Sequence, residues 1–236
     1  MVEGFKITAS KIKRVLKLAV HLPNDYYHNN KKYPLLLVFE GGLFFSFLTE
    51  DNKIIDMKNI LDNCDNEFIT IGLFSPRIPE WNISELDPYY SGNDEKVDIS
   101  YSSIYYDYIV NDLIPLLSQK YRFNDDIGVM GINIGAISVI PLLAKYDTFK
   151  KGIIISPAFD ITNDLIIDDI NKIKNKKIYM YLGGKDTPLE SLNTFYKIEN
   201  IILENNDSTN IIFENENDNS IETIKEHIQK GLDFIV

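Results

Sequence analysis

The sequence predicts an α/β fold in which a mostly parallel central sheet carries helices on both faces. Short apolar runs rich in β-branched residues alternate with longer segments of helical periodicity. These runs are apolar almost throughout, as in strands that are buried on both faces of a parallel sheet. The expected strands span residues 15–22, 35–39, 68–73, 127–130, 152–155, 178–182 and 210–213. The expected helices span residues 49–65, 101–121, 133–146, 165–174, 189–205 and 220–236.

The size and composition of the chain predict one globular domain over residues 1–236. The 236 residues show no break in composition, and 44% of them are hydrophobic. No apolar run reaches the ~20 residues that a membrane-spanning helix needs. The first residues, MVEGFK, lack the basic segment followed by an apolar one that marks a signal peptide. We therefore expect a cytoplasmic protein without a membrane segment.

Charge and cysteine content exclude several classes of partner. The formal net charge of -11 would repel a phosphate backbone, so we expect no nucleic-acid partner. A single cysteine, Cys64, excludes an internal disulfide and a thiolate metal cluster. We expect no cofactor and no metal, and a small-molecule ligand instead. The sequence leaves monomer and homodimer open.

Several segments carry more specific signals. Residues 220–236 place one apolar stripe at helical spacing. Pro115 and Pro141 lie inside expected helices, where a proline costs about 3 kcal/mol, so a kink or restart is expected at each. The polar segment HLPNDYYHNNKKYP joins strands 15–22 and 35–39, which are expected to form an antiparallel lead-in to the sheet. Residues 74–100 are expected to form a long loop over the functional face.

The stretch DDIGVMGINIGAISVI, residues 125–140, leads from an expected strand through a tight turn into a helix. Gly131 and Gly135 frame the turn at the spacing of the nucleophile-elbow pattern G-x-S-x-G, with Asn133 at its centre. The central residue of an elbow adopts a positive φ, which Asn tolerates better than most residues. An amide cannot be converted into a nucleophile by a neighbouring base, so Asn133 keeps the turn and removes the chemistry. The alternative interpretation is a tight turn without any link to catalysis.

Segments along nearly the whole chain resemble the putative-esterase family of α/β-hydrolases, which includes esterase-D-like, enterochelin-esterase-like and feruloyl-esterase-like members. LAVHLPNDYYHNNKKYPLLLVFEGG resembles the family's opening, and PRIPEWN is similar to its Arg-x-x-acid-aromatic signature. YIVNDLIPLLSQKYRF resembles the helix before the elbow strand, and GIIISPAFD a strand that ends in Ser. IYMYLGGKD resembles the strand whose Gly-x-Asp end carries the acid of a catalytic triad. The resemblance implies an α/β-hydrolase fold in a family of serine carboxylic-ester hydrolases.

The same resemblance implies positions for a triad. Asn133 stands where the family has its serine, and Asp186 matches the acid. The segment NDNSIETIKEHIQKGLDFIV aligns with the family's GGH-S-W stretch and places Asn219 on the histidine. Two of the three positions depart from the family pattern, which implies a degenerate triad.

The histidines and serines of the chain are the possible substitutes for the missing triad residues. We expect His227 at the surface, off the apolar stripe of the last helix, and His21 and His28 to be structural or solvated. Without a base nearby, no serine is expected to act as a displaced nucleophile; the candidates are Ser46, Ser138 and Ser156. A carboxylate group of Glu40, Asp186 and Asp218 could hold a metal or act as an acid pair, but no His or Cys pattern supports it.

A ligand pocket would survive the loss of the triad. The resemblance implies an oxyanion hole made by the backbone N–H groups of Ile134 and of Gly42 or Leu43. Arg77 and Trp81 match the family signature: Arg77 would pair with a carboxylate, either to fix its loop or to bind ligand, and Trp81 would line the pocket.

Two functions follow. The first is a non-catalytic α/β-hydrolase relative that binds a small ester-like or acidic ligand, or a protein partner, at the former active site. The alternative is a weakly active carboxylic-ester hydrolase that acts on small acyl or sugar esters through non-standard residues.

Overall fold

The computed structural model describes residues 2–45, 55–64, 67–92, 94–162, 164–207 and 211–235. In these ranges the chain forms an eight-stranded sheet with the strand order β1-β2-β4-β3-β5-β6-β7-β8. The strands β3 to β8 run parallel to one another, as the sequence predicts for a buried α/β sheet. The strands are β1 (Val2–Ala9), β2 (Arg14–His21), β3 (Tyr33–Val38), β4 (Ile69–Phe74), β5 (Phe123–Ile132), β6 (Phe149–Ile155), β7 (Lys177–Tyr181) and β8 (Ile211–Glu214).

The antiparallel lead-in consists of different strands from those expected. It is the hairpin β1–β2, and β2 also pairs antiparallel with β4. The strand β3, expected as the partner of β2, instead lies between β4 and β5 and is parallel to both. The sequence of β1, VEGFKITA, lacks the unbroken apolar run of the other strands, because an edge strand buries only one face and therefore carries polar residues between its apolar ones.

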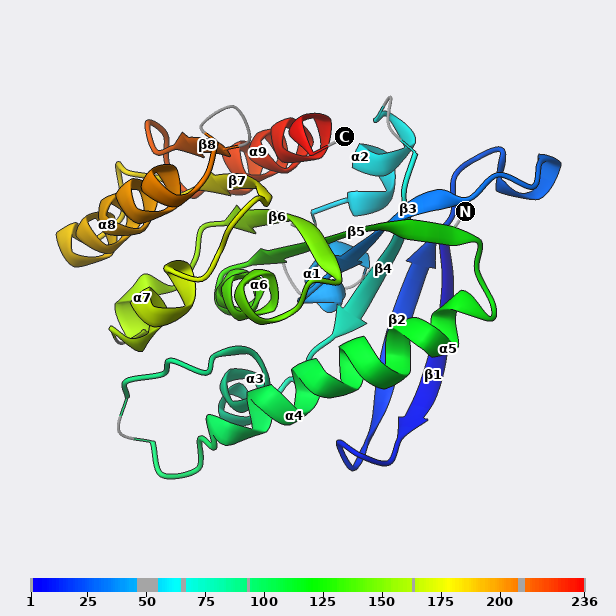
Figure 1. Cartoon of the computed structure of the whole chain (residues 1–236), viewed down its shortest axis with the longest axis horizontal. Helices are drawn as coiled ribbons and strands as arrows, with labels where there is room; N and C mark the ends of the chain where they lie inside the picture. The colour runs from blue at the N-terminus through cyan, green and yellow to red at the C-terminus, as the bar shows by residue number, and fades with distance from the viewer. Residues whose placement is uncertain are drawn as a thin grey trace.

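Helices cover both faces of the sheet (Figure 1). Helix α6 packs on β5 and β6 on one face, while α9 packs on β6 and β7, and α1 on β4, on the other. The helices are α1 (Gly41–Phe45), α2 (Met57–Asp62), α3 (Pro79–Leu86), α4 (Ser100–Tyr108), α5 (Ile114–Ser118), α6 (Ile134–Lys145), α7 (Leu165–Ile170), α8 (Leu189–Asn205) and α9 (Ile221–Phe234).

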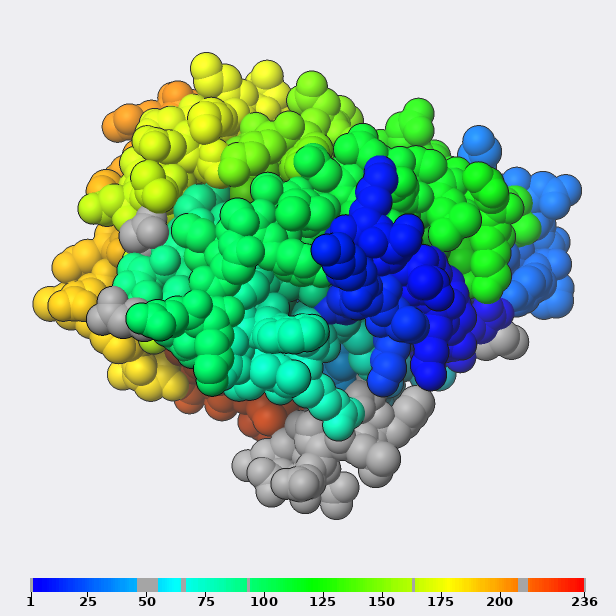
Figure 2. All heavy atoms as spheres, turned by 90° about the horizontal axis from the view of Figure 1, so that it is seen from below, coloured from blue at the N-terminus to red at the C-terminus, as the bar shows by residue number. Residues whose placement is uncertain are grey.

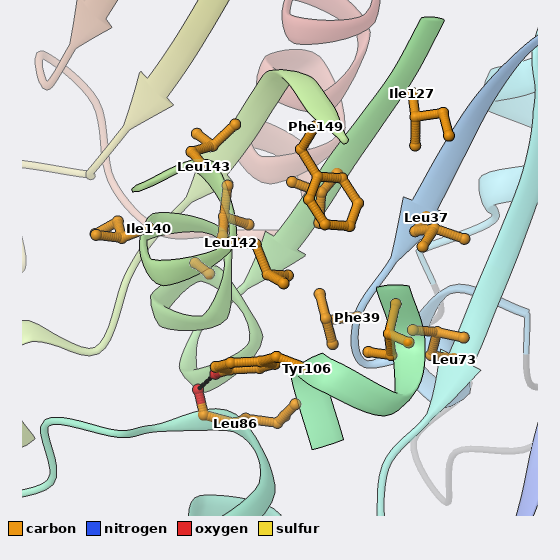
Figure 3. Packing of buried hydrophobic residues seen from close by; sticks show 14 of the residues in the cluster. Leu37, Phe39, Leu73, Leu86, Tyr106, Ile127, Ile140, Leu142, Leu143 and Phe149 are labelled. Atoms are coloured by element: carbon orange, nitrogen blue, oxygen red, sulfur yellow. Dashed lines mark hydrogen bonds between the residues drawn. The ribbon is translucent and has the colours of Figure 1, made fainter. Parts of the chain in front are cut away.

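Each face of the sheet has its own apolar core, because successive side chains of a strand point to opposite faces. In β3, Leu35 and Leu37 pack beneath α6, whereas Leu36 and Val38 pack on the side of α9. Figure 3 shows the first core, in which the Tyr106 hydroxyl donates to the Leu86 carbonyl and ties α4 to the end of α3. Strands buried on both faces explain the unbroken apolar runs of the sequence.

The two prolines behave differently. Before Pro115 the helical segment that begins at Ser100 passes through a π-helical turn at Ile109–Leu113, so the expected irregularity is present. Helix α6 continues through Pro141 without interruption. The stretch 74–100 is less irregular than expected, because α3 forms within it. Of the helix expected at 49–65, the described part contains α2, and residues 49–54 and 65 lie outside the described ranges.

The described helices include none that is both long and apolar enough to span a bilayer.

One carboxyl group lies in an apolar setting away from the sheet edge. Asp87, just after α3, is fully buried, and it accepts a hydrogen bond from the backbone N–H of Tyr89 at 2.8 Å. Its second oxygen has no hydrogen-bond partner among the described residues. Burial disfavours the charged form and raises the pKa of Asp87 from 3.8 to about 7.

This group should make the protein less stable as the pH rises. Between about pH 4 and 7 the folded state holds a proton on Asp87 that the unfolded state releases. The free energy of unfolding should therefore fall by about 1.4 kcal/mol per pH unit from this group alone. Asp87→Asn should flatten that slope in urea denaturation at pH 5, 6 and 7, whereas Asp168→Asn at an exposed position should not. Equal slopes in wild type and Asp87→Asn would contradict the assignment.

Candidate functional site

The turn between β5 and α6 holds Asn133 at φ 54° and ψ -121°. A Cβ at Gly131 would lie 2.0 Å from the carbonyl oxygen of Gly135, so only glycine fits there. The backbone of Asn133 is tied to the neighbouring strand, because its N–H donates to the carbonyl of Ile155 at 3.1 Å. Its side chain is exposed and forms no hydrogen bond with any described residue. The turn therefore presents an unengaged amide at the carboxyl end of β5.

A second asparagine, Asn219, lies just before α9 and connects its own loop with the loops that follow β6 and β7. Its Nδ2 group is 2.9 Å from Asp186 Oδ1, 3.2 Å from the Gly183 carbonyl and 3.1 Å from Thr187 Oγ1. Its Oδ1 atom accepts from the Ser156 hydroxyl at 2.6 Å and from the Gly183 N–H at 3.0 Å. Residues that follow β6 and β7 thus form hydrogen bonds with both the oxygen and the NH₂ group of this amide.

The structure brings Asn133, Asp186 and Asn219 to one cavity of about 360 Å³, which also contains Ser156. We call it the triad cavity. Its polar groups come from the loops that follow β5, β6, β7 and β8. Open α/β sheets bind ligands at this carboxyl edge.

A neighbouring cavity of about 440 Å³ is lined by Gly42, Leu43, Ile134 and Arg77, and we call it the oxyanion cavity. Gly42 and Ile134 lie in the first turns of α1 and α6, where backbone N–H groups have no partner within the helix. The Leu43 N–H donates to the Glu40 carbonyl at 2.8 Å. Of the two alternatives for the second donor, Gly42 is therefore the one whose N–H remains available. Leu43 lines both cavities, which places them on either side of the turn.

Glu40 also lines the oxyanion cavity, and its backbone has a positive φ of 59°. Asn82 Nδ2 donates to its Oε1 atom at 2.7 Å. Burial raises the pKa of Glu40 above its ordinary value, although the Asn82 hydrogen bond opposes this shift.

Arg77 is exposed at this cavity and forms no ion pair with any described residue. No described carboxylate therefore fixes its loop, and its guanidinium is available to an acidic ligand.

Trp81 lies apart from the other predicted site residues. It is 62% exposed on α3 and lines a third cavity, together with residues of the β1–β2 hairpin. The structure therefore does not bring Trp81 into the cavity of Gly42 and Ile134.

None of the three histidines lines the triad cavity or the oxyanion cavity within the described ranges. The surface position expected for His227 is wrong: its side chain is buried, its Nδ1 lies 2.6 Å from the Tyr179 hydroxyl, and its ring stacks on Tyr181 at 3.5 Å. Helix α9 buries a stripe wider than its aliphatic residues alone suggest. His21 is buried and lies 2.8 Å from Asp62, while His28 is exposed.

Neither of the two candidate serines that the structure describes has a hydrogen bond to a histidine. Ser138 is buried and donates to the Leu86 carbonyl at 2.7 Å. Ser156 donates to the amide oxygen of Asn219, and Ser46 lies outside the described residues. The contacts of Gly183 and Thr187 with Asn219 were not foreseen, because no sequence pattern indicates which loops one side chain joins.

The carboxylates do not form a metal centre in the described part of the chain. Asp218 instead accepts hydrogen bonds from the Ser220 N–H at 3.1 Å and the Thr223 hydroxyl at 2.8 Å at the start of α9. These hydrogen bonds lower the pKa of Asp218 to about 2.

A mostly parallel sheet with a glycine-framed turn from strand to helix at the carboxyl end of β5 defines the α/β-hydrolase class. Within this class, the chain belongs to the family described as Putative esterase, whose model matches residues 9–206. No curated protein sequence matches the chain.

Solved structures share the fold at low sequence identity. An IroE-like serine hydrolase from Shewanella oneidensis has a TM-score of 0.79 at 13% identity, over 99% of this chain and 79% of that one. The BES protein from Bacillus cereus has a TM-score of 0.74 at 15% identity, over 99% and 95% of the two chains. A ferulic acid esterase has a TM-score of 0.70 at 13% identity, over 100% and 97%.

The backbone of the turn should prefer glycine to asparagine. Asn133→Gly should raise the free energy of unfolding by about 1 kcal/mol, because glycine adopts a positive φ without strain and the Asn133 side chain has no described hydrogen bond to lose. Asn133→Ala should be less stable than Asn133→Gly in urea denaturation. The exposed helical residue Asn193 provides a control, since there alanine should be more stable than glycine. If alanine were more stable than glycine at position 133 as well as at position 193, the turn would not be strained.

Proposed function

We propose that this protein is a non-catalytic member of its family that binds a small ester-like or acidic ligand at the elbow. The observation that carries the proposal is the environment of Asn219. Its neutral amide holds Ser156 on one side and Asp186 on the other, where a hydrolase would need a titratable base.

The side chains of Asn133 and Ser156 support binding of a ligand rather than catalytic turnover. The amide of Asn133 supplies a donor and an acceptor but no nucleophile. The Ser156 hydroxyl donates to an amide oxygen, which does not accept a proton at neutral pH, so this serine is not activated.

The oxyanion cavity supports the choice of ligand. The first turns of α1 and α6 direct free N–H groups from Gly42 and Ile134 toward an oxygen atom, and a helix N-terminus favours a carbonyl or carboxylate there. Arg77 adds a positive charge to the same cavity. A short acyl chain carrying a carboxylate or ester group matches these donors and the apolar side chains of Leu43 and Phe74.

A second candidate is weak ester hydrolysis through non-standard residues. Glu40 favours it, because a buried carboxyl group with a raised pKa lines the same cavity as the Gly42 and Ile134 N–H groups. In that case Glu40 would act as a general base toward water, and Glu40→Gln would abolish the residual activity.

Restoring the two triad residues tests the first proposal. The wild-type protein should hydrolyse p-nitrophenyl butyrate no faster than Asn133→Ala and should not react with a fluorophosphonate probe. Asn133→Ser alone should stay inert because its hydroxyl lacks a base. Asn133→Ser with Asn219→His should gain on the order of 100-fold or more over the single variant, since losing nucleophile and base costs about 10⁶ in kcat. Probe labelling of the wild-type protein, or a folded but inert double variant, would refute the assignment of these positions.

Butyrate provides a direct test of ligand binding. Its titration should shift the backbone N–H signals of Gly42 and Ile134 in NMR spectra in a saturable way, and 1-butanol should do so less. Arg77→Gln should weaken butyrate binding roughly two- to fivefold, because it removes the positive charge that lines the same cavity. Unchanged signals at saturating butyrate would exclude a carboxylate site at the elbow.

A further inference from the structure

The cavity that contains Trp81 is built from three distant parts of the chain. The turn of the β1–β2 hairpin contributes Ile12, Lys13 and Arg14, helix α3 contributes Trp81, and the start of α4 contributes Tyr101. Its volume is about 260 Å³. Figure 2 looks onto this face, where the hairpin in dark blue lies against the cyan-to-green segments that follow β4.

The floor of this Trp81 cavity is a buried ion pair. The Arg14 guanidinium donates to the carboxylate of Glu85, whose side chain is only 1% exposed. Arg14 also donates to the Phe74 carbonyl at 2.6 Å. Two of the five N–H donors of Arg14 are thus accounted for, and its side chain remains 16% exposed at the cavity.

The walls are mostly apolar. Trp81 is the only tryptophan of the chain, and its ring is 62% exposed beside the buried Ile12. The Tyr101 hydroxyl donates to the Ile12 carbonyl at 2.6 Å, which leaves the ring of Tyr101 as its contribution to the wall. A large exposed aromatic face next to apolar side chains suits a planar ring.

The lining has a surplus of one positive charge in a protein of net charge -11, because Lys13, Arg14 and Lys96 stand against the two carboxylates of Glu85 and Asp98. Lys13 forms no ion pair with any described residue. Lys96 is exposed and has one carboxylate partner, the partly buried Glu80, at 3.6 Å. The acidic rim residue Asp98 is engaged at the start of α4, where it accepts from the Ser100 N–H at 3.0 Å and the Ser100 hydroxyl at 2.6 Å. With Glu85 paired to Arg14 and Glu80 to Lys96, Lys13 is the cation of the lining that has no described carboxylate partner, and Lys96 lies beside it on the rim.

We propose that the Trp81 cavity is a second ligand site, which binds a small aromatic carboxylate. The aromatic ring lies against Trp81, and the carboxylate faces Lys13 and Lys96. The volume lies just below the ~300 to 1,000 Å³ of sites for drug-sized ligands, which limits the ligand to about one ring with a short substituent.

This site is separate from the elbow. Of the described residues, Pro76 alone lines both the Trp81 cavity and the oxyanion cavity. None of its residues belongs to the triad cavity. The second site therefore stands independently of the function proposed for the elbow.

NMR titration with benzoate tests the proposal, because the single indole N–H of Trp81 gives one resolvable signal. That signal should shift saturably with benzoate and less with benzyl alcohol or benzylamine, which present the same ring without the negative charge. Lys13→Gln should raise the dissociation constant roughly two- to fivefold, the range for an exposed charge pair. Lys17→Gln, an exposed lysine of β2 that lies outside the cavity, should not change it.

Two further outcomes separate this site from the elbow. Benzoate should still shift the Trp81 signal with unchanged affinity in Asn133→Leu, and Trp81→Ala should abolish the binding measured by calorimetry. The proposal is overturned if the Trp81 signal does not move, if benzylamine binds as well as benzoate, or if Asn133→Leu abolishes binding.

Discussion

The contact between the two glycines of the β5–α6 turn determines the geometry of the whole functional edge. Because Gly131 approaches the Gly135 carbonyl without a Cβ between them, α6 starts directly at the end of the strand. Ile134 therefore lines one cavity and Asn133 the next. The strand β5 lies between β3 and β6, so the turn also sets the distance from α6 to the loops that carry Gly42 and Ser156. A side chain at Gly131 would displace all of these groups together.

Asn219 fulfils a structural requirement that is independent of catalysis. An amide can donate and accept at once, so one side chain satisfies the polar groups at the ends of β6 and β7 without a buried charge. His227, a short distance along α9, is buried and does not line the cavity that contains Asn219. Its ring is stacked on Tyr181, whose hydroxyl donates to the Asp218 carbonyl, next to Asn219. The aromatic layer beneath α9 thus supports the loop that carries the amide.

Sequence patterns predicted the elements with strong, regular signals. Helix α8 has the predicted bounds, and the apolar strands β3 to β7 lie within a few residues of their expected positions. The elements that were missed have weak local signals: β1 is an edge strand with one partly buried face, and α3 begins at Pro79 within a stretch rich in turn-forming residues. His227 was misplaced because burial of a polar side chain depends on a partner, here Tyr179, that periodicity does not reveal. Of the site residues, Asn133, Asp186 and Asn219 share a cavity, whereas the position of Trp81 depends on a hairpin turn far away in the sequence.

The positive φ at Asn133 also restricts the paths along which this protein can evolve. A residue at such a turn can exchange only with the few types that accept the conformation, so the backbone protects the architecture of the site while its chemistry changes. In the genetic code, asparagine codons differ by a single base from codons for serine and, at another position, from codons for histidine. Asn133 is therefore one nucleotide substitution away from serine, and Asn219 is one away from histidine.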